Sequence, residues 1–236
     1  MHSPSLRIAL LLACAASSHL CFRAPNPPPP QEEQLKKTST FERRVRWVTF
    51  SCQVRVPLFH IYVPFSFAYP HEQAGAALGV LCDAAATYAL PLGLLEIEPT
   101  FLLGVSMMVF GCFIRQWCFQ TLGRLFTFEV SISPEHRLVT GGPYAYVRHP
   151  SYTGIFLVLA GATTVMCSRN SWFRQCGILE RGGAPLLVAW MALCIWSANC
   201  LRQRLRVEDE ELKIRFGKIW EDYAARVPYT LIPGLV

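Results

Sequence analysis

The sequence predicts an all-α, polytopic membrane protein with about five to six transmembrane helices and a cytosolic, helical C-terminal tail. Three observations lead to this prediction. Hydrophobic residues make up 52% of the 236 residues and charged residues 16%, whereas a soluble domain has roughly 25% charged residues. Several runs carry no charge over a length that, as a helix, rises about 27 Å and nearly spans the hydrocarbon core. Basic residues gather after the last of these runs, as expected for a cytosolic tail.

The N-terminal region, residues 1–44, holds the first candidate span at residues 8–22. A short apolar run behind a basic residue is also typical of a secretory signal. The run is nevertheless long enough for a tilted or slightly short span, so a retained transmembrane helix is favoured. Prolines at residues 25–30 predict a stiff, extended connector, and residues 31–44 form a charged linker.

The second region, residues 45–122, is predicted to contain further transmembrane helices. Its candidate spans are residues 45–69, 73–95 and 99–114. The first carries three basic side chains and either crosses the membrane or lies partly in its interface. The second is interrupted by Asp83 and bent by a proline. The third has no charge and is able to continue past Arg115 to about Leu122.

The third region, residues 123–236, is predicted to carry the function. Residues 151–168 and 184–201 are uncharged, and the short polar loop between them predicts a helical hairpin. A hairpin returns residues 123–150 to the side of the membrane that holds the tail. Basic residues after the last span place that side in the cytosol. The three arginines of the loop then lie on the far side, as an exception to the same rule.

The tail has helical spacing. Arg204 and Glu208 stand four residues apart and share one face of a helix, which Gly217 interrupts and Pro228 stops. On spacing alone this is an ordinary solvated ion pair worth about 0.3–0.5 kcal/mol. However, Arg204 comes less than one turn after Leu201, at the depth of the lipid headgroups. There it is able to meet the anionic end of a lipid-like molecule.

A polar motif, HRLVTGGPYAYVRHPSYTG at residues 136–154, adjoins the apolar span that begins near residue 151. Polar groups pressed against a span are costly unless they serve a function. The side chains able to bind a ligand or take part in a reaction are those of His136, Tyr144, Arg148, His149 and Tyr152. Together with the tail, this motif predicts a membrane enzyme whose active site lies at the bilayer surface.

Charge and cysteine usage argue against other classes of site. The net charge is +6, but no compact basic patch is interleaved with stacking aromatics, so no nucleic-acid partner is predicted. The ten cysteines include no CxxC pair, so neither a metal site nor a redox dithiol is expected. Most lie in apolar runs, where a reduced cysteine acts as a small buried hydrophobe.

The stretch GPYAYVRHPSYTG, the hairpin and the tail RLRVEDEELKIRFGKIWEDYAARVPYTLIPG together resemble the isoprenylcysteine carboxyl methyltransferase family. The resemblance covers most of the chain and is strongest from about Phe126 to the end. Phospholipid N-methyltransferases and, more distantly, sterol reductases share the RHPxYxG core, whereas the RVPYTLIPG ending is similar to carboxyl methyltransferases. The PNPPPP connector and the FTFEV segment resemble fungal members.

The resemblance implies methylation of the C-terminal carboxylate of prenylated cysteine in CaaX-processed proteins, with S-adenosylmethionine as cofactor. It implies an endoplasmic reticulum membrane enzyme that is surrounded by membrane lipids and has a cytosol-facing active site; it leaves the oligomeric state open. Arg204 is the implied catalytic residue and contacts the substrate carboxylate. The implied cofactor-binding residues are Glu129, His136, Arg137, Leu138, Val139, Tyr144, His149, Pro150, Ser151, Tyr152 and Glu208. Glu129 stands where animal relatives carry Gln, and Asp209 where the family often has a second Glu.

The implied reaction suits these residue types. A terminal carboxylate has a pKa of about 3.3–3.7 and is already ionised, so no general base is needed. Alignment and electrostatic preorganisation then supply most of the rate. Three alternatives stay open: a phospholipid N-methyltransferase, an NADPH-dependent sterol reductase, for which the chain is short, and a non-catalytic membrane scaffold.

Overall fold

The computed structural model describes residues 4–28, 92–127, 137–175, 177 and 182–235. Within these ranges the chain forms helices and no β-strand. The candidate span at residues 45–69, and the one at 73–95 apart from its last four residues, lie outside the described part. The predicted all-α class is confirmed.

Four long helices make up the bundle. They are α1 (Pro4–Phe22), α4 (Pro99–Leu122), α5 (Pro150–Cys167) and α7 (Ala184–Phe216). The short elements are η3 (Leu92–Leu95), η4 (Gly123–Leu125), η5 (Gly142–Ala145), α6 (Trp172–Gln175) and α8 (Lys218–Arg226). Each long helix is apolar enough and long enough to cross a membrane. The chain is therefore a multi-pass membrane protein, with four candidate spans in its described part.

Prolines and glycines set the helix ends. Pro99 and Pro150 open α4 and α5, where a fixed φ and a missing N–H group carry no penalty. Gly217 ends α7 with a φ of 51°, in the left-handed region that favours glycine. No breaker lies between Pro185 and Gly217, so α7 runs for 33 residues through the predicted span and into the tail. At 1.5 Å per residue it is about 50 Å long and extends beyond a hydrocarbon core of about 30 Å.

Helices α4 and α5 touch through their backbones at two pairs of glycines. A Cβ atom added to Gly111 would lie 2.7 Å from the carbonyl oxygen of Gly154, and one added to Gly154 would lie 2.6 Å from the Gly111 oxygen. Gly104 and Gly161 face each other in the same way, at 2.9 and 2.6 Å. In each helix the two glycines are seven residues apart and so lie on one face. Small residues permit this close packing in a membrane, where water does not drive helices together.

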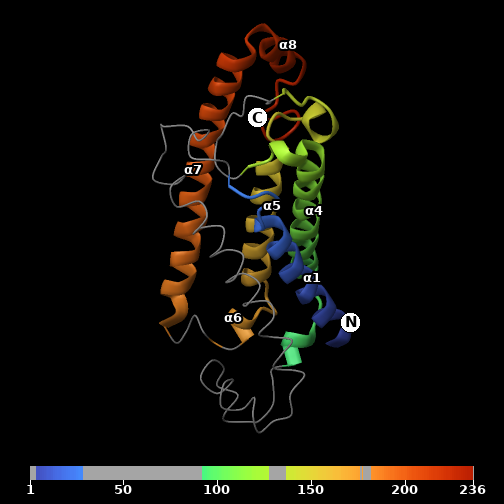
Figure 1. The fold of residues 1–236 in the computed structure, drawn as a ribbon. Coiled ribbons are helices and arrows are strands. Elements are labelled where there is room, and N and C mark those ends of the chain that lie inside the picture. The colour runs from blue at the N-terminus through green and yellow to red at the C-terminus, as the bar shows by residue number, and fades with distance from the viewer. Residues whose placement is uncertain (1–3, 29–91, 128–136, 176, 178–181, 236) are drawn as a thin grey trace.

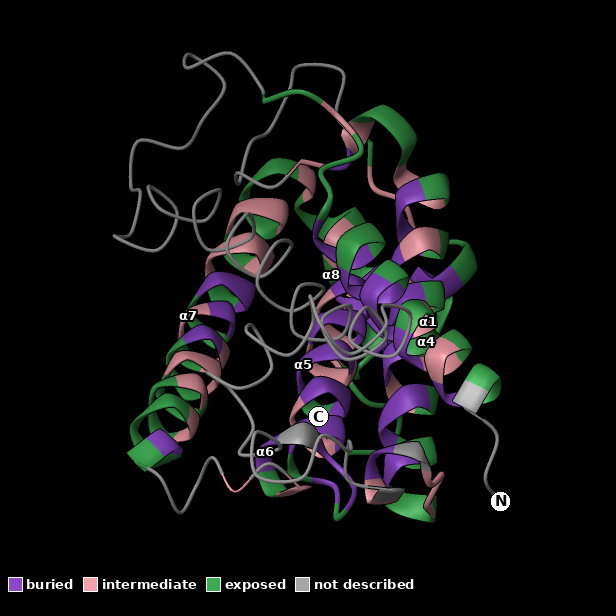
Figure 2. Cartoon of the chain, turned by 90° about the horizontal axis from the view of Figure 1, so that it is seen from below, coloured by how far each residue is buried: buried purple, intermediate pink, exposed green. Residues whose placement is uncertain are grey.

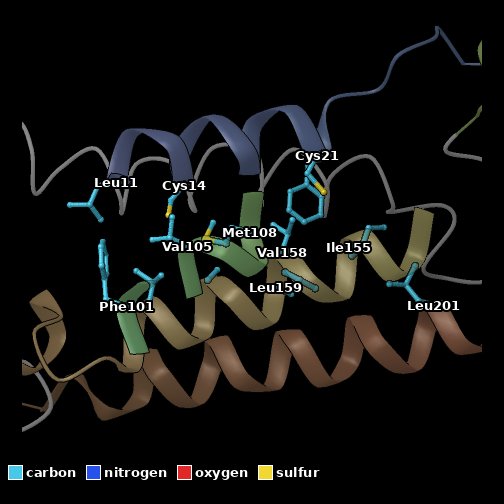
Figure 3. Close-up of a cluster of buried hydrophobic side chains, with 13 residues drawn as sticks. Leu11, Cys14, Cys21, Phe101, Val105, Met108, Ile155, Val158, Leu159 and Leu201 are labelled. Carbon is cyan, nitrogen blue, oxygen red and sulfur yellow. The ribbon is translucent and has the colours of Figure 1, made fainter. Parts of the chain in front are cut away.

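The apolar core lies between α1, α4 and α5, with Leu201 entering from α7 (Figure 3). Its buried members include Leu11, Cys14, Cys21, Phe101, Val105, Met108, Ile155, Val158 and Leu159. The predicted role of cysteines as buried reduced thiols holds for Cys14, Cys21, Cys112 and Cys118, whereas Cys167 is exposed.

Helix α7 stands beside this bundle and is buried mainly toward one end (Figures 1 and 2). Among its residues, those buried by other described parts of the chain are Ser197, Leu201, Arg204 and Leu205. Its first half touches the bundle through Trp190, whose indole N–H donates to Thr163 Oγ1 at 3.0 Å. The firm contact of α7 is therefore at the end where α5 begins.

Polar side chains tie α1 to its neighbours at both ends. Arg7 lies 4.5 Å over the ring of Phe101 and donates to the carbonyl oxygen of Asn170 at 2.6 Å. At the other end, Gln116 donates to the Leu20 carbonyl at 2.9 Å, and the Arg115 guanidinium donates to the carbonyl of Cys21. These contacts join both ends of α1 to the other described helices.

Replacement of Gly161 by leucine tests the contact between α4 and α5. The new side chain would meet the Gly104 oxygen and Met108, so it should destabilise the fold by about 1–3 kcal/mol. Ala160→Leu is the matched control, because Ala160 is the preceding residue and is exposed. Thermal unfolding of the two variants in the same detergent would measure the difference. Equal unfolding temperatures would contradict the glycine-mediated contact.

Candidate active site

The candidate site lies where α5 begins and where α7 leaves the bundle, at the end that holds α8 and the C-terminus (Figure 1). His149, the residue before α5, is 6% exposed and sits between two carboxylates of α7. Its Nε2 lies 2.9 Å from Asp209 Oδ1, and its Nδ1 lies 3.4 Å from Glu208 Oε2. The motif and the tail, predicted to face the same side, therefore meet directly.

Glu208 connects three other side chains of this cluster. Its Oε1 accepts a hydrogen bond from the Tyr152 hydroxyl at 2.5 Å and from Arg204 Nε at 2.9 Å. Arg204 is only 7% exposed, so its ion pair with Glu208 is not the solvated pair that spacing alone would suggest. The Glu208 side chain is 21% exposed, so it lies near the surface of the cluster.

Arg148 is held inside the protein by the C-terminal segment, residues 227–231. Its Nη1 donates to the carbonyls of Val227 and Pro228 at 3.1 and 2.8 Å, and its Nη2 donates to Thr230 Oγ1 at 3.0 Å. Its Nε pairs with Asp209 Oδ2 at 3.3 Å. The guanidinium is therefore used for internal contacts.

The same segment also binds the backbone of the motif. The backbone bonds are Arg148 N–H to Tyr229 O and His149 N–H to Thr230 O, both at 2.9 Å. The Thr153 side-chain hydroxyl also donates to Leu231 O at 2.7 Å. In α8, just before this segment, the Tyr223 hydroxyl donates to the Tyr144 carbonyl at 2.9 Å. The end of the chain thus fixes the loop that leads into α5.

Helix α4 supports the motif from the opposite side. Arg115 is buried, and its Nη1 donates to Ser151 Oγ at 2.6 Å. Tyr144 is buried as well, and its hydroxyl bonds to the Cys118 thiol. Burial raises the pKa of Tyr144 well above its usual value, so the phenol stays neutral. In this state only a small part of the Tyr144 ring is open to a ligand.

The surroundings of His149 keep it charged. Burial alone lowers its pKa, but hydrogen bonds to Asp209 and Glu208 and the charges of these carboxylates outweigh burial and raise the pKa to about 9. At neutral pH, His149, Arg148 and Arg204 are then three cations facing the carboxylates of Glu208 and Asp209. This excess of positive charge favours an anionic ligand nearby.

The structure brings together four of the site residues expected from the sequence: His149, Tyr152, Arg204 and Glu208. Ser151 and the buried Pro150 lie next to them at the start of α5. Arg137 is exposed, and Leu138 and Val139 are half-buried in a segment without regular structure. Glu129 and His136 lie outside the described residues.

The sequence did not identify two contributors, and a third had been noted only as a family position. The sequence predicts Arg115 only as the residue past which the uncharged run at 99–114 is able to continue, although a lone charge in an apolar run is an available signal of a functional role. Tyr223 carried no comparable signal. Asp209 was noted as a place where the family often has Glu, but not as a partner of His149.

Residues 103–214 match the family model of isoprenylcysteine carboxyl methyltransferase (ICMT). This part of the chain is similar to the ICMT family. The family match includes the motif and residues Arg204, Glu208 and Asp209, while α1, α8 and the C-terminal segment lie outside it.

Similar proteins carry the same family name. The chain is 31% identical over 127 residues to protein-S-isoprenylcysteine O-methyltransferase B of Arabidopsis thaliana, covering 53% of this chain and 55% of the plant protein. It is 34% identical to the Mus musculus and 32% to the Homo sapiens protein-S-isoprenylcysteine O-methyltransferase, each over 53% of this chain and 38% of the relative. The aligned stretch thus spans about half or less of these ICMT relatives. They do not test the resemblance to fungal members.

The pKa of His149 predicts how stability depends on pH. Its value in the folded protein, about 9, exceeds the unfolded value of about 6.5. The stabilisation, on the order of 3 kcal/mol, is therefore fully present below about pH 6.5 and is lost as the pH rises through 9. Unfolding temperatures measured from pH 6 to 10 should fall over this window. His149→Gln should abolish this drop in unfolding temperature, whereas the same replacement at the exposed His19 should leave the drop unchanged. A wild-type protein whose unfolding temperature does not drop over this pH range would contradict the raised pKa of His149.

Proposed function

We propose that the protein transfers a methyl group from S-adenosylmethionine to the C-terminal carboxylate of a prenylated cysteine. The observation that carries this proposal is the buried Arg204 paired with Glu208, joined to His149 and Tyr152 where a span leaves the bundle. The ICMT family match over this region supports the same reaction. The chain aligns with only part of each relative, so activity and substrate are inferred from the site.

The side chains present fit S-adenosylmethionine, which when bound supplies a methyl group on a sulfonium cation. Glu208 offers a half-buried carboxylate that can accept from an ammonium or from ribose hydroxyls. Tyr152 and His149 hold that carboxylate in place through their own hydrogen bonds. The remaining proposed cofactor contacts are Glu129, His136, Arg137, Leu138, Val139, Tyr144, Pro150 and Ser151.

Arg204 is proposed to orient the substrate carboxylate. Its Nε is bound to Glu208, which fixes the plane of the guanidinium. A planar guanidinium binds two carboxylate oxygens at once, whereas an ammonium ion supplies charge without that geometry. Because the carboxylate is ionised in water, the protein needs to exclude water and align the oxygen with the methyl group rather than remove a proton.

We further propose that the site faces the cytosol at the endoplasmic reticulum membrane. Exposed arginines lie at the same end of the bundle, including Arg202 and Arg206 of α7, as the positive-inside rule requires of a cytosolic side. The prenyl chain would then stay in the bilayer beside the apolar part of α7 while its carboxylate reaches headgroup depth. The partners are thus a prenylated C-terminal cysteine and the surrounding lipids.

Binding and transfer measurements separate this function from its alternatives. Calorimetry with S-adenosylmethionine on the purified protein should show binding, whereas a non-catalytic scaffold predicts none. Incorporation of labelled methyl groups should then favour a prenylcysteine over phosphatidylethanolamine. The opposite preference would indicate a phospholipid N-methyltransferase.

Replacement of Glu208 by glutamine should weaken S-adenosylmethionine binding more than prenylcysteine binding. Losing a charged hydrogen bond costs about 1.5–3 kcal/mol, or roughly tenfold or more in Kd. Glu210→Gln removes the same charge from an exposed position two residues away and should leave both affinities unchanged. The assignment of Glu208 fails if its variant binds the cofactor as the wild type does.

Replacement of Arg204 by lysine should remove most activity and leave the Kd for S-adenosylmethionine nearly intact. Charge at the site is kept, but the two-oxygen alignment is lost, which is worth on the order of 10²-fold in rate. Single-turnover rates at saturating cofactor would measure the effect, with Arg206→Lys, an exposed position on the same helix, as control. A rate within a few-fold of the wild type would mean that Arg204 only balances charge.

A further inference from the structure

Asp209 and Glu208 are adjacent in the sequence, but their carboxylates contact different sets of side chains. Glu208 contacts Tyr152 and Arg204 through one oxygen and His149 through the other. Asp209 uses one oxygen on His149 and the other on Arg148, at 2.9 and 3.3 Å. Both partners of Asp209 are thus neighbouring residues of the loop before α5.

Arg148 connects Asp209 to the C-terminal segment. Its other nitrogens donate to the carbonyls of Val227 and Pro228 and to the Thr230 hydroxyl. A continuous set of polar contacts therefore runs from α7 through Asp209 and Arg148 to the C-terminal segment. The same segment accepts the backbone N–H groups of Arg148 and His149.

We propose that Asp209 is a positioning residue, which holds His149 and Arg148 against α7 and, through Arg148, keeps the C-terminal segment closed over the motif. Glu208 is then left to face the cofactor, a consequence that rests on the proposed function. The part of the inference that concerns His149 and the C-terminal segment does not depend on any ligand.

The charges around His149 explain why Asp209 is needed in addition to Glu208. The titratable and charged groups nearest to the imidazole are Glu208, Asp209 and Arg204 on α7, Arg148 and Tyr152 on either side of it in the motif, Arg115 on α4 and Tyr223 on α8. Glu208 divides its charge among several partners, and its contact with His149 is the longer one, at 3.4 Å. Without Asp209, the buried Nε2 would lose its partner and a buried proton would become costly.

Titration of His149 without any cofactor tests the first part of the proposal. Nuclear magnetic resonance of histidine-labelled protein in micelles, with His149→Gln to assign the signal, would follow the imidazole. Asp209→Asn should lower the titration midpoint of His149 by about one to three units. Glu210→Gln, which removes the same charge from an exposed neighbour, should not shift it. An unchanged midpoint in Asp209→Asn would overturn the proposal.

Amide hydrogen exchange tests the link to the C-terminal segment. The Arg148 and His149 amides donate to this segment, so their exchange should accelerate about tenfold or more in Asp209→Asn if closure is weakened by a single charged contact. Arg148→Lys, which keeps the charge but loses the multiple donors, should accelerate the same amides while leaving the His149 midpoint in place. Should Asp209→Asn not fold, Arg148→Lys alone decides: unchanged exchange there would overturn the link.

Cofactor affinity distinguishes this inference from the proposed function. If the function is right, Asp209→Asn should weaken S-adenosylmethionine binding and make its Kd vary between pH 6 and 8, where the wild-type Kd is flat because His149 stays protonated. If the wild type binds no S-adenosylmethionine, the proposed function fails, while the titration and exchange results still decide the role of Asp209. If Asp209 were purely structural, Asp209→Asn would change the Kd for S-adenosylmethionine by the same factor at every pH. That result would contradict the proposal that Asp209 positions a charged His149.

Discussion

The close contact of α4 and α5 is the constraint on which the rest of the structure depends. Two glycine pairs allow the backbones to meet, and no larger side chain fits between them without separating the helices. This contact sets how far the first turn of α5 lies from the end of α4. It therefore brings Ser151 within 2.6 Å of Arg115, and the loop carrying His149 is fixed at the edge of the bundle.

Within the described residues, helix α7 is joined to this frame chiefly by the site itself. Lipid does not drive apolar helices together as water does, and the first half of α7 contributes few buried residues to the described part of the chain. The ion pairs that Arg148 and His149 form with Glu208 and Asp209 lie where α7 meets the loop before α5. The residues proposed to bind ligands thus also join α7 to the bundle, so stability and function share the same contacts.

The sequence predicted the elements better than the contacts between them. The uncharged run at residues 151–168 predicted α5 to within a residue at each end, because helix length in a membrane is set by hydrocarbon thickness. The run at residues 99–114 predicted the start of α4, and the helix takes the possible continuation past Arg115 to Leu122. The tail helix followed from the spacing of Arg204 and Glu208. Its fusion with the preceding span was less apparent, since it follows from the lack of a breaker before Gly217.

The pairing of His149 with Asp209 had no local signal, because 60 residues separate the two positions along the chain. The same holds for Arg148 and the C-terminal segment, which meet only after the hairpin has closed. Within the motif, His149 is an expected cofactor-binding residue, and Arg148 stands out by its charge. The structure assigns that charge internal partners, and Tyr144 likewise lies against Cys118. Sequence patterns thus predicted which segments carry the candidate site, whereas the role of each residue in it depends on tertiary contacts.

Because the site residues form several ion pairs with one another, the choice of substitution determines what an experiment on them reports. Removing one partner of a buried ion pair leaves an uncompensated charge and costs about 3–5 kcal/mol, more than the pair itself contributes. Truncation of Arg204 or His149 to alanine would therefore report on folding before it reported on catalysis. Replacements that keep shape and hydrogen-bonding capacity, and change only charge or geometry, separate the two effects. The exposed positions on the same helix, Arg206 and Glu210, carry the same chemical groups in water, where charge pairs contribute about 1 kcal/mol or less. A difference between a buried residue and its exposed counterpart thus measures what burial at the site adds.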